Sequence, residues 1–209
     1  MLDKVSDFIV CDMLFKNETI SDEQKEVMVF GVKRILEDTP KYIAIIGICI
    51  YLNLLKELLI VLLVTASYKT FVGGAHARTN LECFISSLVI FLTPILLPIY
   101  INFSSTVMYI LYSAVCISSL YIIIKVAPGD TEEIPILKKK RRVKMKIKAA
   151  IILTLWYFST IFIVKSMYIK QIILLTILFI NLMATNIAYK LFRCKHSYET
   201  EEFAEYFNK

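Results

Sequence analysis

Apolar residues along this chain gather in long continuous runs, which differ from the alternating pattern of a half-buried strand. Four runs are almost free of charged residues and cover 84–101, 104–126, 149–164 and 171–192. Each approaches the roughly 20 residues that a helix needs to cross the ~30 Å hydrocarbon layer of a bilayer. The pattern therefore predicts four transmembrane helices.

A fifth apolar run, 42–68, is interrupted by Asn53 and by the neighbouring charges of Lys56 and Glu57. Neither half, at about a dozen residues, is long enough to span a bilayer alone. The run is either one helix with the Lys/Glu pair near its middle, or two half-length helices that form a re-entrant pair. We favour the pair, whose non-helical backbone would need protein around it at that depth.

The stretch before this run, SDEQKEVMVFGVKRILEDTP at 21–40, mixes apolar residues with many charges. It opens on Ser21 followed by two acidic residues, which is typical of a helix start, and it closes on Pro40. Apolar residues recur among the charges at Val27, Phe30 and Ile35. We expect an amphipathic helix that ends at Pro40 and lies at the membrane surface or against the bundle.

Composition agrees with a membrane protein. The hydrophobic fraction is 57%, against roughly 45–50% in ordinary soluble domains, and the mean hydropathy is +0.65. The start of the chain carries no apolar run, so we do not expect a cleaved signal peptide. We expect an all-α integral membrane protein with a single polytopic domain over residues 1–209. Its parts would be amphipathic helices (1–41), the interrupted segment (42–68), a polar segment (69–83), two spans (84–126), a basic loop (127–148), two spans (149–192) and a tail (193–209).

The basic loop predicts the orientation in the membrane. Eight of its residues are basic: Lys138, Lys139, Lys140, Arg141, Arg142, Lys144, Lys146 and Lys148. Such a loop stays in the cytoplasm, and it could also bind anionic lipid head groups or an acidic peptide, at ~1 kcal/mol per basic residue. Nucleic-acid binding is not expected, because no aromatic platform accompanies the charges. Counting back two spans places residues 69–83 on the cytoplasmic side.

Candidate chemistry lies in KTFVGGAHARTNLECFISS, residues 69–87, between two apolar runs. Taken singly, His76 is an ordinary interfacial histidine and Cys83 an ordinary buried cysteine. Together they form the minimal set for thiol chemistry, a nucleophile and a base that activates it. The thiolate is the reactive species, and an ordinary cysteine needs help to ionise near neutral pH.

The spacing of these two residues requires a break in the helix. In one regular helix their Cα atoms would lie about 10 Å apart along the axis, too far for contact. The sequence from Thr79 to Glu82 matches a capping box, which predicts that a helix begins at Thr79 with Cys83 in or just after its first turn. The helix dipole and Arg78 would then favour the thiolate. The flexible pair Gly73 and Gly74 would let His76 fold back over that turn.

Other site chemistries fit the sequence poorly. A zinc site needs three or four ligands, and the other His–Cys neighbours, Cys194 and His196, lie at the far end of the chain, where we expect them to be structural or incidental. Five scattered cysteines do not indicate a disulfide framework. No phosphate-binding glycine-rich loop occurs elsewhere, so we expect no nucleotide, metal or other cofactor.

Two stretches resemble known sequences. GGAHARTNLECFISS, with a cysteine seven residues after the histidine, resembles the active-site segment of the accessory gene regulator B (AgrB) family of bacterial membrane peptidases. APGDTEEIPILKKKRRVKMK, residues 127–146, resembles that family's Ala-Pro…Pro-Ile loop with its basic tail. One departure is Lys69, where members generally carry Arg, so a bidentate contact there would be lost while the charge is kept.

The resemblance implies a function. AgrB-like proteins cut the C-terminal portion from a small AgrD-like precursor peptide and keep the remainder as a thioester on the catalytic cysteine. A thiol or hydroxyl within the peptide then releases a cyclic thiolactone or lactone, a quorum-sensing signal precursor. Carried onto this chain, Cys83 is the nucleophile and His76 the base. The supporting residues are Lys69, Gly73, Gly74, Arg78, Thr79 and Glu82.

The resemblance also implies a homodimer in the bacterial cell membrane. From the basic loop we expect the active site to face the cytoplasm and anionic lipids to surround the loop. The alternative is a protein without enzymatic activity, either a small transporter or a scaffold that binds lipid or peptide. A transporter would carry paired intramembrane charges or inverted repeats. Lys56 and Glu57 are the only candidate pair, and we find no repeat.

Overall fold

The computed structural model describes residues 2–10, 21–77, 79–101, 103–131 and 135–196. All regular elements in these ranges are helices, apart from one isolated β-bridge. The chain forms two compact units, residues 1–48 and 49–209. The expected all-α class is confirmed.

The first unit contains α1 (Leu2–Phe8) and most of α2 (Asp22–Tyr51). The predicted helix end at Pro40 is wrong, because α2 continues through this proline. Proline removes one backbone donor and crowds the preceding turn, but apolar residues follow it for a further three turns. Ion pairs flank the position, with Lys41 Nζ lying 2.6 Å from Asp38 Oδ1. One missing hydrogen bond therefore does not end a helix of 30 residues.

Asn53 ends α2 and divides the apolar run 42–68. Its φ of 57° is left-handed, a conformation that asparagine tolerates at helix ends. The Asn53 N–H donates to the Ile50 carbonyl at 3.1 Å and the Leu54 N–H to the Cys49 carbonyl at 2.8 Å, the two bonds of a Schellman motif. The interpretation as a single helix is therefore wrong.

The second half of that run is longer than its apolar pattern suggested. Three consecutive elements, α3 (Leu55–Val64), the π-helical η2 (Thr65–Lys69) and α4 (Thr70–Val72), form one continuous helical stretch. At 1.5 Å per residue it extends about 27 Å. The π-helical turn was not foreseen from the sequence. Such turns occur mostly as insertions within α-helices, often near functional sites.

Within the described residues, four helices are long and apolar enough to cross a membrane: α5 (Asn80–Tyr100), α6 (Ser105–Lys125), α7 (Lys139–Phe162) and α8 (Met167–Ala184). These are the four predicted spans. Thr79, Ser104 and Ser166 cap α5, α6 and α8 with their side chains. A short helix, α9 (Asn186–Leu191), follows α8.

Two boundaries differ from the prediction. The predicted loop 127–148 is helical from Lys139 onward, because lysine, arginine and methionine are good helix formers even where solvent surrounds them. The predicted span 171–192 is divided at Thr185, which has an extended conformation with ψ 156°. The apolar pattern continues across this point, so it gave no sign of the break.

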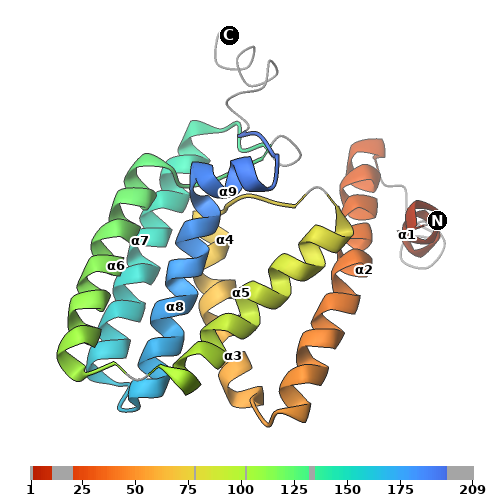
Figure 1. Ribbon diagram of the computed structural model, residues 1–209. Helices are drawn as coiled ribbons and strands as arrows, with labels where there is room; N and C mark the ends of the chain where they lie inside the picture. The colour runs from red at the N-terminus through yellow and green to blue at the C-terminus, as the bar shows by residue number, and fades with distance from the viewer. Residues whose placement is uncertain (1, 11–20, 78, 102, 132–134, 197–209) are drawn as a thin grey trace. The chain divides into compact units, whose positions relative to one another are not determined.

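α8 is the central helix of the second unit. It contacts α3, α5 and α6, and it lies between the α6–α7 pair and α5 in Figure 1. A polar seam joins three elements here: the Tyr68 hydroxyl donates to Asn181 Oδ1 at 3.0 Å, and Asn181 Nδ2 donates to Ser119 Oγ at 2.6 Å. Many large apolar side chains on the outer surfaces of the spans are exposed, for example Ile117 and Phe162. A lipid environment accounts for that exposure.

Candidate functional site

The site begins where α4 ends, at a backbone contact between two glycine positions. Gly73 forms a parallel bridge with Gly129. The Gly129 N–H donates to the Val72 carbonyl at 2.8 Å, and the Gly74 N–H donates to the Gly129 carbonyl at 2.8 Å. One residue further, the Ala75 N–H donates to the Met183 carbonyl at the end of α8, at 2.7 Å. The two stretches singled out in the sequence therefore contact each other.

Glycine is required at positions 73 and 74 because backbone atoms of other segments approach both residues closely. Gly73 has a φ of 74°, and a Cβ added there would overlap the Gly129 carbonyl oxygen. Gly74 has a φ of 140°, and its Cβ would lie 2.9 Å from the Met183 carbonyl oxygen. Both positions favour glycine on conformational grounds as well. The expectation of a flexible hinge is wrong, because hydrogen bonds fix this segment on two sides.

Thr79 caps α5 as the sequence predicted. Its φ/ψ are extended, and its Oγ1 accepts from the Glu82 N–H at 3.2 Å. The Cys83 N–H donates to the Thr79 carbonyl at 2.9 Å, the first intrahelical bond. The return bond of the capping box, from the Thr79 N–H to the Glu82 carboxylate, is not among the hydrogen bonds of the described residues. The helix break between His76 and Cys83 is confirmed.

His76 and Cys83 lie on either side of this cap. His76 is in the non-helical segment between α4 and α5, and its side chain is exposed. Cys83 lies in the first turns of α5, and its side chain is half-buried. The segment thus carries a thiol and an imidazole beside a helix N-terminus, which are the groups needed for nucleophilic catalysis.

The other predicted site residues surround this segment. Lys69 is the last residue of η2, half-buried, and its carbonyl accepts from the Gly73 N–H at 2.8 Å. Glu82 is exposed on the first turn of α5. Arg78 lies outside the described residues. Among the described residues, no group of three or more His, Cys, Asp or Glu could hold a metal ion.

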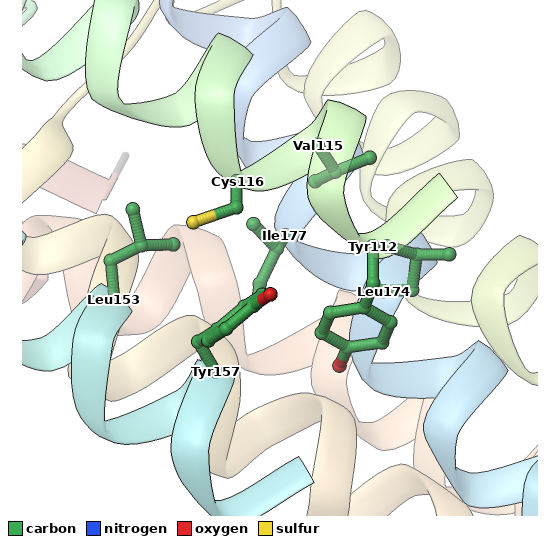
Figure 2. Close-up of a pocket in the computed structure, with 7 residues that line it drawn as sticks. All are labelled: Tyr112, Val115, Cys116, Leu153, Tyr157, Leu174 and Ile177. Atoms are coloured by element: carbon green, nitrogen blue, oxygen red, sulfur yellow. The ribbon is translucent and has the colours of Figure 1, made fainter. Parts of the chain in front are cut away.

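The remaining described cysteines occupy different environments. Cys49 is buried, and Cys194 follows α9. Figure 2 shows the Cys116 sulfur pointing toward Leu153, in a crevice between α6, α7 and α8 that Tyr112 and Tyr157 also line. Apolar and aromatic side chains line this crevice, and neither histidine is among them. Cys11 lies outside the described residues. Cys83 is therefore the described cysteine that shares a polar segment with an exposed histidine.

Sequence reasoning missed a buried ion pair next to the glycine contact. Arg142 Nη1 lies 2.8 Å from Asp130 Oδ2, and the Ile136 N–H donates to the same oxygen at 2.9 Å. The Tyr189 hydroxyl donates to the Asp130 carbonyl at 2.9 Å. Arg142 is one of eight basic residues in the run 138–148, and no local pattern in the sequence distinguishes it or links it to Asp130.

His196 also has a structural environment. Its ring stacks on Tyr189 with centroids 3.6 Å apart, and its Nε2 lies 3.0 Å from Asn186 Oδ1. Arg193, with a φ of 53°, ends α9 in a second Schellman motif that turns the chain back toward Tyr189. Of the two expectations for Cys194 and His196, structural or incidental, this geometry favours the structural one.

Comparison with known proteins gives one consistent result. The family model for accessory gene regulator B matches residues 8–185. An accessory gene regulator protein B of Staphylococcus saprophyticus is 33% identical over 75% of this chain and 79% of its own length. A putative AgrB-like protein of Clostridium acetobutylicum is 29% identical over 82% and 80%. No solved structure matches the chain.

Proposed function

The chain belongs to the accessory gene regulator B family, and from that premise we propose that it is a membrane-embedded cysteine endopeptidase. Family membership gives it a role in the agr quorum-sensing system, and its four long apolar helices make it a multi-pass membrane protein. Its substrate in this proposal is a small AgrD-like precursor peptide, which it cleaves and helps to cyclise.

In the first step, His76 accepts the thiol proton of Cys83, and the sulfur attacks the carbonyl carbon of the scissile peptide bond. The carbon–nitrogen bond then breaks, and the leaving amine takes its proton from His76. The C-terminal part of the precursor departs. The N-terminal part remains on Cys83 as a thioester.

In the second step, a thiol or hydroxyl within the bound peptide attacks the thioester carbonyl. The bond to the Cys83 sulfur breaks, and a thiolactone or lactone ring forms. The proton of the attacking group returns to Cys83 by way of His76. Cyclisation competes with hydrolysis, so the thioester must be shielded from water while the peptide group is held close.

The observation that carries this proposal is the position of Cys83, half-buried in the first turns of a helix that Thr79 caps, four residues after the cap and seven after an exposed His76. A helix N-terminus favours a thiolate. An amphipathic precursor lying on the membrane would meet this segment at the interface, which lowers the entropic cost of their encounter.

The same proposal includes three features of the assembly. The active site faces the cytoplasm, because the basic start of α7 carries the charge that stays on that side. Anionic lipids gather around these basic side chains. The protein is a homodimer, as the family resemblance implies.

The experiment uses purified protein in liposomes and an AgrD-type precursor peptide. Changing Cys11, Cys49, Cys116 and Cys194 together to Ser should leave cleavage intact. Cys83→Ala in that background should abolish it, and His76→Ala should lower the rate by about 10²-fold or more. Cleavage that survives Cys83→Ala would refute the peptidase and favour a scaffold or transporter that binds the peptide without cutting it.

A further inference from the structure

Asp130 anchors a short loop, residues 127–131, to the start of α7. Only 1% of its side chain is exposed. Its carboxylate accepts from Arg142 Nη1 at 2.8 Å and from the Ile136 N–H at 2.9 Å, with a longer contact from Arg142 Nη2 at 3.4 Å. A buried carboxylate is tolerated when its charge is paired and its oxygens are hydrogen-bonded. The position of this loop therefore depends on the ion pair.

Arg142 differs from the basic residues around it. Its guanidinium also donates to the Ile136 carbonyl at 3.2 Å and contacts the Pro128 carbonyl at 3.5 Å. The side chain of Arg141, one residue earlier, is exposed. The two neighbours have the same charge, but only Arg142 is directed toward Asp130. Arg141 is therefore a matched control.

Tyr189 holds the loop from the side of α9. Its hydroxyl donates to the Asp130 carbonyl at 2.9 Å, and its side chain is buried. A Cβ added to Gly129 would lie 3.0 Å from this hydroxyl, so the tyrosine packs against the glycine that contacts Gly73 and Gly74. The ring of His196 stacks on the Tyr189 ring.

The loop is bonded in turn to the segment that carries His76. Gly129 exchanges two backbone hydrogen bonds with Val72 and Gly74, and His76 follows Gly74 by two residues. A continuous series of contacts thus runs from Arg142 through Asp130 and Gly129 to the backbone next to His76. Displacing the loop would break the hydrogen bonds to Gly129 and leave this segment held by the bond from the Ala75 N–H to the Met183 carbonyl.

We propose that Asp130, Arg142 and Tyr189 are positioning residues, which hold residues 127–131 as a clamp on the glycine pair and thereby set the place of His76 relative to Cys83. The catalytic consequence of the clamp rests on the proposed peptidase function. The clamp itself does not rest on that function, because its contacts can be tested without substrate.

The first test measures hydrogen exchange of the full-length protein in detergent micelles. Asp130→Asn and Arg142→Gln should each speed exchange at the amides of Gly74 and Gly129, which are bonded across the clamp, by about tenfold or more, because local opening no longer breaks a paired charge. Tyr189→Phe, which removes one hydroxyl and keeps the packing, should give a smaller change in the same direction. Arg141→Gln should leave these amides unchanged. If these amides exchange at the same rate in all four variants, the proposed clamp is wrong.

The second test measures alkylation of Cys83 by iodoacetamide in protein whose other four cysteines are Ser. His76→Ala and Asp130→Asn should each slow alkylation of Cys83. Both changes act through the same imidazole, so the double variant should react at the rate of the slower single variant, within about twofold. Arg142→Gln should also slow alkylation. Arg142→Lys keeps the charge but cannot make two contacts to the Asp130 carboxylate, so its alkylation rate should lie between those of Arg142→Gln and the unchanged protein. Effects that multiply in the double variant would overturn the link to His76.

The third test separates positioning from peptide binding. With the AgrD-type precursor, Arg142→Gln and Asp130→Asn should lower kcat about tenfold or more and leave KM within about twofold. A rise in KM shared by Arg141→Gln and Arg142→Gln, with Asp130→Asn unchanged, would make Arg142 a peptide contact and overturn its positioning role. If Cys83→Ala protein still cleaves while the exchange results hold, the proposed function fails and the clamp stands.

Discussion

At the scale of single residues, Thr79 separates the two proposed catalytic side chains and starts the helix that carries Cys83. This feature could be predicted from the sequence, because a capping residue contacts an amide only three positions away. The role of Gly73 could not be predicted in the same way. Glycine is needed there because the carbonyl of Gly129, 56 positions further along the chain, approaches it closely. No local pattern in the sequence predicts that approach.

Replacing Thr79 tests the cap. Thr79→Ala should cost about 0.5–2 kcal/mol of cap stability and loosen the first turn of α5, so alkylation of Cys83 by iodoacetamide should slow even without substrate. Thr79→Asp keeps a cap and should retain an ordered turn, while its charge opposes the thiolate in a way that added salt partly screens. Thr70→Ala is the control, because the Thr70 hydroxyl bonds only within its own helical stretch, to the Ala66 carbonyl. Unchanged Cys83 reactivity in Thr79→Ala would contradict a functional cap.

At the scale of elements, the four spans could be predicted because each is a long apolar run, and length alone selects helices in a bilayer. The ends of helices were harder to predict. The sequence predicts a helix end at Pro40, yet α2 continues past it. Thr185, in contrast, interrupts an apolar pattern that contains no proline or glycine. Asn53 did mark a true end, since asparagine adopts the left-handed conformation that a Schellman motif needs.

The polar seam between helices gives a test of the packing. Asn181 is 2% exposed and bonds both Tyr68 and Ser119. Asn181→Leu should lower the free energy of unfolding by about 1–2 kcal/mol, at the upper end for interhelical hydrogen bonds in membranes. The measurement is unfolding in mixed micelles by titration with a denaturing detergent.

A double-mutant cycle supplies the control. Tyr68→Phe and Asn181→Leu should be non-additive, because each removes the same bond. Thr176→Val, which removes a hydroxyl bonded to the Ile172 carbonyl of its own helix, should instead add to Tyr68→Phe. Additive effects of Tyr68→Phe and Asn181→Leu would show that the seam does not contribute to stability.

At the scale of the whole molecule, the proposed orientation places the start of α7 in the cytoplasm and the α7–α8 connection outside. Lys140 and Lys165 have exposed side chains at these two positions. In protein with no other cysteine, Lys165→Cys should react with an impermeant maleimide added to intact cells. Lys140→Cys should react only after the membrane is opened. The reverse labelling pattern would move the proposed active site out of the cytoplasm.

The central claim is that Cys83 carries the peptide as a thioester, and intact-protein mass spectrometry tests it most directly. The protein should retain Cys83 as its only cysteine, and the residue of the precursor that closes the ring should be replaced by Ala so that the thioester accumulates. The account predicts an added mass equal to the N-terminal part of the precursor, released by hydroxylamine and absent from Cys83→Ala. Cleaved precursor without any adduct on Cys83, or an adduct that persists in Cys83→Ala, would contradict it.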